Sequence, residues 1–180
     1  AGPFPYERWA DVLAAAGYAV VMPDSFARQY RPSNCDPETH RIGFFPQAFE
    51  MRDEEIRYAL QRLRELPWVD QRNLFLMGYS EGGLAVALWR GGGFNAQIIT
   101  AWTCTHRFNS GLNGVRAPLA TPLLAINHQQ DPWYSGATAG SCSAKLAGYK
   151  NARELILPGA GHDTAYNAQA VEAVLHLLRE

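Results

Sequence analysis

The sequence predicts an α/β fold in which a mostly parallel sheet is covered by helices on both faces. Short apolar runs alternate with segments of helical periodicity along almost the whole chain. These runs are apolar on both faces, as expected for strands that lie buried between two layers of helices. The chain has 180 residues, of which 47% are hydrophobic, so we expect a single domain over residues 1–180.

Each expected element follows from the spacing of its apolar residues. Apolar positions at i, i+3, i+4 and i+7 predict helices over residues 9–16, 50–66 and 171–178. Shorter helices are expected over residues 84–89 and 143–148. Apolar runs bounded by turn residues predict strands over residues 18–22, 73–77, 97–102, 122–127 and 154–157. Residues 25–48 contain three prolines and show no steady period, which is typical of a long functional loop.

The charge and the cysteine count exclude several classes of function. A net charge of −1 gives no electrostatic basis for binding nucleic acid or an anionic membrane. No apolar run is long enough to span a bilayer. Three cysteines are too few for a disulfide scaffold and are compatible with either a cytoplasmic or an exported, periplasmic protein. A bridge between Cys104 and Cys142 is one hypothesis, because both follow strands on the same side of the predicted sheet.

The segment Gly-Tyr-Ser-Glu-Gly at residues 78–82 lies between an expected strand and an expected helix. This G-x-S-x-G context is that of the nucleophile elbow of α/β-hydrolases, in which a strained turn exposes the serine hydroxyl. We expect Gly78 and Gly82 to be required because a side chain would collide with the neighbouring strand or helix. The backbone N–H of Glu81 is then available to an oxyanion. The alternative is a glycine-rich turn that carries an ordinary exposed serine.

An acid and a base follow Ser80 in the chain order that α/β-hydrolases use. Asp131 comes just after the strand expected at 122–127, and His162 comes just after the strand expected at 154–157. The carboxyl ends of parallel strands meet at one edge of the sheet, so the three side chains are expected to converge. Two alternatives stay open: Asp131 could initiate a turn before Pro132, and His162 could be a surface histidine beside a helix-capping Asp163.

Several neighbours of this constellation are candidates for a substrate pocket. Tyr79, Trp102 and Trp133 stand at strand ends and could form an apolar pocket, although core packing explains Trp102 equally well. Glu81 is compatible with favourable charge at a helix start or with a carboxylate at the mouth of the site. Arg52 is compatible with a solvated helix charge or with a group that binds a substrate carboxylate.

The remaining histidines give weaker signals. His40 and His106 lie in expected loops and are candidates to line the pocket. His128 precedes Asp131 by three residues, but no further ligand cluster supports a metal site there.

The chain resembles the dienelactone hydrolase family of α/β-hydrolases. The resemblance covers nearly the whole chain and is carried by residues 18–26, residues 78–83 and the loops that hold Asp131 and His162. It implies that Ser80 is the nucleophile, Asp131 the acid and His162 the base. It also implies a fold without a cap domain and the hydrolysis of a small carboxylic ester or lactone through an acyl-enzyme, with no metal or organic cofactor.

The sequence departs from the family at two places. Well-known members use cysteine as the nucleophile, so Ser80 favours a broader serine esterase over an enzyme for cyclic dienelactones. The family also has a strand and an oxyanion-hole loop before the first helix, usually with a His-Gly pair. We therefore expect residues 1–180 to be N-terminally incomplete, with the second oxyanion donor outside them. Two alternative functions are a peptidase of the prolyl-oligopeptidase type and a non-catalytic α/β-hydrolase-like binding fragment.

Overall fold

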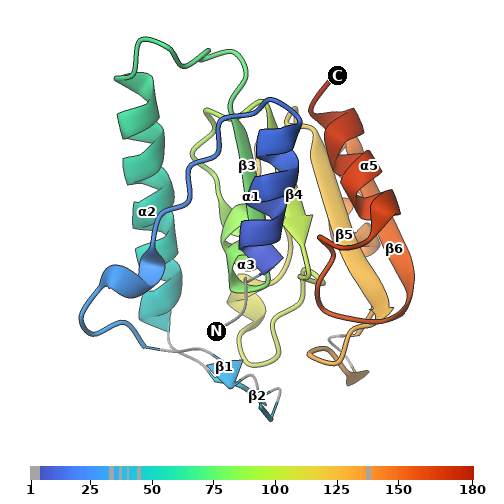
Figure 1. Cartoon of the computed structure of the whole chain (residues 1–180). Helices are drawn as coiled ribbons and strands as arrows, with labels where there is room; N and C mark the ends of the chain where they lie inside the picture. The colour runs from blue at the N-terminus through green and yellow to red at the C-terminus, as the bar shows by residue number, and fades with distance from the viewer. Residues whose placement is uncertain (1–4, 33–34, 37, 40, 44–45, 137–138) are drawn as a thin grey trace.

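A four-stranded parallel sheet forms the centre of the computed structural model (Figure 1). The structure describes residues 5–32, 35–36, 38–39, 41–43, 46–136 and 139–180. The order of the strands across the sheet is β3-β4-β5-β6. Their bounds are Phe75–Tyr79 for β3, Ala96–Thr100 for β4, Leu123–Gln130 for β5 and Ala152–Ala160 for β6.

Helices cover both faces of this sheet. The helices are α1 (Pro5–Ala15), α2 (Pro46–Arg64), α3 (Glu81–Leu88), α4 (Ser143–Leu146) and α5 (Ala168–Leu177). One face packs against α1 and α5, which lie in front of the sheet in Figure 1. The other face packs against α2, α3 and α4. The predicted α/β fold with a parallel sheet between helices is therefore confirmed.

The central strand β4 illustrates why the apolar runs were informative. All five of its residues are buried, because helices cover both of its faces. Successive side chains of a strand point to opposite faces. Accordingly, Ile98 joins the apolar cluster beneath α1 and α5, whereas Ile99 joins the cluster beneath α3 and α4. A strand in this position needs apolar residues at consecutive positions, as the sequence has.

The strand predicted over residues 18–22 is wrong. These residues contain no strand, and Val20, Val21 and Met22 are 37%, 53% and 50% exposed. A strand requires a neighbour with which to exchange backbone hydrogen bonds, and no described strand lies beside this segment. Residues 18–23 and β3 instead line a groove of about 510 Å³.

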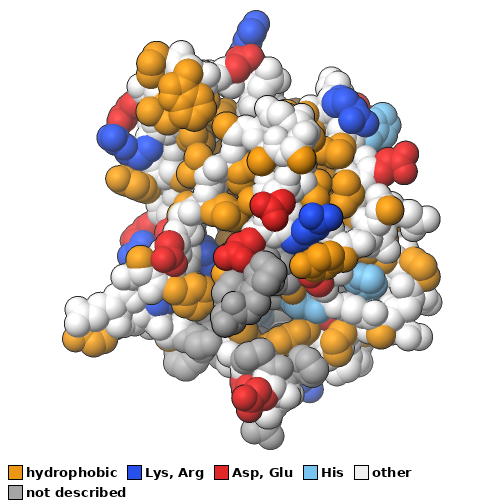
Figure 2. Space-filling view, viewed as in Figure 1, with side chains coloured by type: hydrophobic (Ala, Val, Ile, Leu, Met, Phe, Trp, Pro, Cys, Tyr) orange, Lys and Arg blue, Asp and Glu red, His pale blue; other side chains and the backbone are white. Residues whose placement is uncertain are grey.

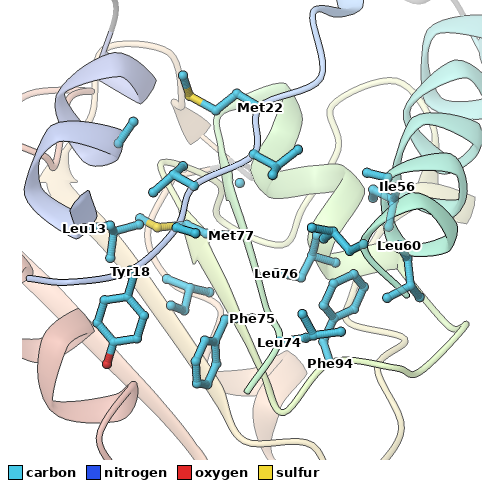
Figure 3. Close-up of a pocket in the computed structure, with 18 of the residues that line it drawn as sticks. Leu13, Tyr18, Met22, Ile56, Leu60, Leu74, Phe75, Leu76, Met77 and Phe94 are labelled. Atoms are coloured by element: carbon cyan, nitrogen blue, oxygen red, sulfur yellow. The ribbon is translucent and has the colours of Figure 1, made fainter. Parts of the chain in front are cut away.

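The groove beside β3 is mostly apolar. Its walls come from α1 and the segment after it, from α2 and from β3; Figure 3 labels Leu13, Tyr18, Met22, Ile56, Leu60, Leu74, Phe75, Leu76, Met77 and Phe94. Figure 2 shows hydrophobic side chains exposed over the part of this face that lies between α2 and α1. Within the described residues, no strand pairs with the outer edge of β3, and this groove lies beside it.

The long loop expected over residues 25–48 contains more structure than predicted. It holds the short 3₁₀ helix η1 (Ser25–Ala27) and the antiparallel pair β1 (Cys35–Asp36) and β2 (Arg41–Ile42). It ends earlier than expected, because α2 begins at Pro46, where proline's fixed φ suits a first helical position. Within the part of the chain that the structure describes, no helix is long and apolar enough to cross a bilayer.

Candidate active site

Ser80 lies at the tight turn between β3 and α3 and has φ +55° and ψ −115°. A positive φ is strained for a residue with a side chain, and such strain persists only where the surroundings enforce it. Two backbone hydrogen bonds do so here. Ser80 N–H donates to the carbonyl of Thr100 at 2.9 Å, and Leu84 N–H donates to the carbonyl of Ser80 at 3.1 Å. The turn is thus anchored to β4 on one side and to α3 on the other.

The glycines around Ser80 have different roles. A Cβ on Gly78 would lie 2.1 Å from the carbonyl oxygen of Gly82, so the close approach of β3 to α3 requires glycine there. A Cβ on Gly82 would meet nothing within 4 Å, so the expected collision at this position is wrong. Instead, Gly83 packs closely, because its Cβ would lie 2.6 Å from the carbonyl oxygen of Thr100. Helix α3 therefore rests on β4 through Gly83.

The structure brings Ser80, Asp131 and His162 together. The Oγ of Ser80 lies 2.9 Å from Nε2 of His162, and Nδ1 of His162 lies 2.7 Å from Oδ2 of Asp131. Asp131 follows β5 directly, and His162 follows β6 by two residues, so each side chain leaves the carboxyl end of its strand. The carboxylate can only accept, which places the proton of neutral His162 on Nδ1 and leaves Nε2 to accept from Ser80.

Burial strengthens the pairing of Asp131 with His162. The side chain of Asp131 is 2% exposed and that of His162 is 12% exposed. The second carboxylate oxygen of Asp131 accepts from the backbone N–H of Trp133 at 2.9 Å, so Asp131 also forms the turn that the alternative interpretation proposed. Asp163 bonds to the N–H of Ala165, while Asn167 caps α5. His162 is accordingly not an exposed surface histidine.

Aromatic rings surround the imidazole of His162. The ring centroids of Tyr79, Trp133 and Tyr134 lie 5.1, 5.4 and 6.1 Å from that of His162. Burial raises the pKa of the Tyr79 and Tyr134 phenols, with a further contribution from nearby carboxylates, so both hydroxyls stay neutral. Trp102 is 4% exposed and lies in the core beneath α3 and α4, where it packs against Tyr134.

Tyr134 is a residue that the sequence reasoning missed. It is buried, and its hydroxyl donates to the carbonyl of Ala101 at 2.9 Å, which ties the loop after Asp131 to the end of β4. Its place three residues after Asp131 was the only signal available in the sequence. The structure thus puts Tyr79 and Trp133 beside His162, together with Tyr134, and puts Trp102 in the core.

The carboxylate of Glu81 binds two arginines. Arg31 and Arg52 both contact its Oε1, the latter through Nε at 3.0 Å. Arg52 also contacts the hydroxyl of Ser25 and pairs with Glu55 at 3.6 Å. Arg52 is therefore engaged by protein groups rather than being only a solvated helix charge. The side chain of Arg31 is 2% exposed, so this network fastens the segment after η1 to the residue that follows Ser80.

The cysteines and the pocket candidate His106 lie outside the hydrogen-bonded chain of Ser80, His162 and Asp131. Cys104 and Cys142 are joined by a disulfide bond, and Cys35 is exposed and lies outside that bond. The ring nitrogen Nδ1 of His106 accepts from the backbone N–H groups of Phe108 and Asn109, both at 3.1 Å. His106 thus organises its own loop. His40 lies outside the described residues, and among the described residues no group of three candidate ligands could hold a metal ion.

Comparisons with solved structures agree with this fold. No curated protein sequence matches the chain significantly. Among solved structures, SOBER1 from Arabidopsis thaliana matches with a TM-score of 0.51 and 15% identity over 77% of this chain and 66% of that chain. One variant of SOBER1 matches with a TM-score of 0.53 at the same identity, over 77% of this chain and 67% of the variant. The chain thus spans about two thirds of these structures, and at this identity the likeness concerns the fold alone.

A family assignment comes from the sequence itself. The sequence model of the dienelactone hydrolase family matches residues 6–176, which include Ser80, Asp131 and His162. The match extends over nearly all of the chain, from α1 to the last turns of α5. The chain therefore belongs to the dienelactone hydrolase family.

Proposed function

We propose that this protein is a serine hydrolase that cleaves small carboxylic esters or lactones through an acyl-enzyme. One observation carries the proposal: a continuous hydrogen-bonded chain runs from Ser80 through His162 to the buried Asp131. A serine hydroxyl becomes a good nucleophile only when a base takes its proton, and the base needs a third group to hold its tautomer. Membership in a family of hydrolases supports the same conclusion.

Acylation would begin with attack of Ser80 Oγ on the carbonyl carbon of the ester. The hydroxyl proton passes to Nε2 of His162 as the Oγ–C bond forms, and Asp131 stabilises the resulting imidazolium. His162 then gives this proton to the departing alkoxide oxygen as the C–O bond breaks. In deacylation, His162 accepts a proton from water as the water oxygen attacks the acyl carbon. The bond between that carbon and Ser80 Oγ then breaks, His162 returns the proton to Oγ, and the carboxylic acid leaves.

The backbone N–H of Glu81 would donate to the oxyanion of the tetrahedral intermediate. Glu81 is the first residue of α3, where the N–H groups of the first turn point out of the helix and the helix dipole favours negative charge. One such donor contributes on the order of 100- to 1000-fold to turnover. The network of Arg31 and Arg52 on the Glu81 side chain supports this role, because it holds the residue in place.

Substitution of Ser80 tests the proposal directly. We expect Ser80→Ala to abolish hydrolysis of p-nitrophenyl esters and labelling by a fluorophosphonate, because both reactions require the serine oxygen. Ser110→Ala is the matched control, since Ser110 is an exposed serine at the start of the short 3₁₀ helix η2 (Ser110–Leu112). It should react as the unsubstituted protein does. Undiminished ester hydrolysis by folded Ser80→Ala would refute the proposal.

A comparison of ester and amide substrates distinguishes the proposed esterase from the peptidase alternative. Ester and aminoacyl-amide substrates with the same acyl group differ only in the leaving group. We expect the ester to be the better substrate of the two. Faster cleavage of the amide, with loss in Ser80→Ala, would favour a peptidase, whereas a folded protein that no fluorophosphonate labels would favour the binding fragment.

A further inference from the structure

We propose that His128 is a positioning residue that sets the geometry between Asp131 and His162. The imidazole of His128 lies against the backbone on both sides of His162, and Asp131 directly follows the strand that carries His128. This inference rests on the proposed function, because it assigns His128 a role in the same site. His128 does not touch Ser80, Asp131 or His162 through any hydrogen bond of the described structure, so it would act through the backbone.

The first contact is a hydrogen bond to the residue after His162. Nε2 of His128 lies 3.1 Å from the backbone carbonyl oxygen of Asp163. A carbonyl oxygen only accepts, so this bond requires a hydrogen on Nε2 of His128. The bond joins residues 35 positions apart in sequence, and it fixes the peptide that leaves His162 relative to β5.

The second contact involves the residue before His162. A Cβ on Gly161 would lie 3.1–3.2 Å from three atoms of the His128 ring, so the backbone of Gly161 rests directly against that ring. The ring thus occupies the space that a side chain at position 161 would need, on the side of the peptide that enters His162. The His128 side chain thus holds Gly161 by packing and Asp163 by a hydrogen bond, with His162 between them.

The pairing of β5 with β6 is irregular next to His128. Strands β5 and β6 pair regularly up to His128 opposite Leu157, and the register then shifts, so that Gln130 lies opposite Ala160. Two steps along β5 therefore match three steps along β6. An extra residue in one strand bends that strand and locally interrupts the ladder. His128 stands at the last regular pair and supplies the contacts to residues 161–163 that the ladder no longer provides.

These contacts matter for catalysis because they determine how the His162 ring is aligned with Ser80 and Asp131. The two hydrogen bonds of His162, at 2.7 and 2.9 Å, require its ring to be placed accurately between two side chains from other strands. A shift of about 1 Å in such an arrangement can lower turnover on the order of 100-fold. Loss of the His128 contacts should therefore lower kcat while leaving KM nearly unchanged, because substrate binding does not involve them.

Two substitutions of His128 separate positioning from a general structural role. His128→Leu keeps apolar volume but removes the donor to Asp163, and His128→Gln keeps an N–H donor on a side chain of similar reach. We expect kcat for a p-nitrophenyl ester to fall on the order of 10- to 100-fold in His128→Leu. His128→Gln should recover most of this loss. His176→Gln is the matched control, because His176 is 64% exposed on α5, and it should keep full activity.

A spectroscopic measurement makes the test independent of ester hydrolysis. The proton shared between Nδ1 of His162 and Asp131 should give a low-field 1H NMR resonance that is absent from Asp131→Asn. We expect this resonance to shift or broaden in His128→Leu and to return in His128→Gln. Failure of the proposed function would show separately, as full activity of Ser80→Ala. An unchanged resonance and unchanged kcat in His128→Leu, or equal losses of kcat and melting temperature in both His128 variants, would overturn the proposal.

Discussion

Ser80 combines a strained backbone with a hydroxyl that lies against a base. A non-glycine residue at φ +55° costs about 1–3 kcal/mol. Hydrogen bonds from Ser80 to Thr100 and from Leu84 to Ser80 offset this cost. The strain turns the hydroxyl out of the sheet toward His162, which a residue in ordinary strand or helix conformation at this position could not do. Strain at this residue is therefore coupled to the geometry of the site.

The glycines of the elbow should differ sharply in their tolerance of alanine. We expect Gly83→Ala to lower the free energy of unfolding by about 1–3 kcal/mol, because its Cβ would be forced against Thr100. Gly82→Ala should instead change stability by no more than about 1 kcal/mol, in the stabilising direction, because the position is helical and open. Urea unfolding of both variants measures the difference. Equal destabilisation by the two alanines would contradict this assignment.

At the scale of elements, the structure separates what a sequence pattern can predict from what it cannot. The burial of β4 on both faces and the stripe of α5 depend on local spacing, which the sequence displays. Residues 18–22 have the same strand-like composition, but a strand also needs a partner, and that depends on residues far away in the chain. The sequence therefore contains the apolar run, but the part of the chain that the structure describes has no neighbouring strand with which residues 18–22 could form backbone hydrogen bonds.

The candidate site likewise has features that the sequence predicts and features that it does not. The chain order of Ser80, Asp131 and His162 could be predicted, because each follows an apolar run and parallel strands end at one edge. The closeness of Gly83 to β4 and the contact of His128 with Asp163 could not be predicted. Each joins a side chain or a glycine to the backbone of a distant segment, and no residue type or spacing marks such a pair.

The loop after β4 should make stability depend on pH through His106. Burial lowers the pKa of His106, whose Nδ1 must stay unprotonated to accept from Phe108 and Asn109. The unfolded chain therefore binds this proton more readily than the folded protein does. The contribution of His106 to stability is complete above about pH 6.5 and is lost as the pH falls toward the lowered pKa of the folded state.

Substitution of His106 isolates this contribution. His106→Asn keeps a hydrogen-bond acceptor that does not titrate near neutral pH. We expect the free energy of unfolding of this variant to decline less between pH 7 and pH 5 than that of the unsubstituted protein. His176→Asn, which removes an exposed histidine, is the control and should leave the decline unchanged. The same decline in His106→Asn as in the parent protein would contradict the role of His106.

At the scale of the whole molecule, the disulfide links two segments that follow different strands. Cys104 lies after β4 and Cys142 lies after the Asp131 turn, 38 residues later. Closing a loop of this length removes conformational entropy from the unfolded chain, which corresponds to about 4 kcal/mol in the chain-entropy model. Both cysteines are buried in the apolar cluster beneath α3, and Cys142 directly precedes α4. The bond therefore links the start of α4 to the segment that follows β4.

Removal of the disulfide should therefore lower stability strongly. We expect the double variant Cys104→Ala/Cys142→Ala to lose about 2–4 kcal/mol of unfolding free energy, as measured in urea. A thiol titration of the unreduced, unfolded protein should detect the thiol of Cys35 and no second one. Three reactive thiols in the unreduced protein would contradict the bond.

The same bond divides the chain topologically. Together with residues 105–141 it closes a covalent ring, and Asp131 lies inside that ring while Ser80 and His162 lie outside it. A protease that cuts the chain once anywhere in the ring leaves both fragments covalently joined through Cys104 and Cys142. The carboxylate could then not diffuse away from its two partners after a single cut, so the nicked protein would keep all three groups in one molecule.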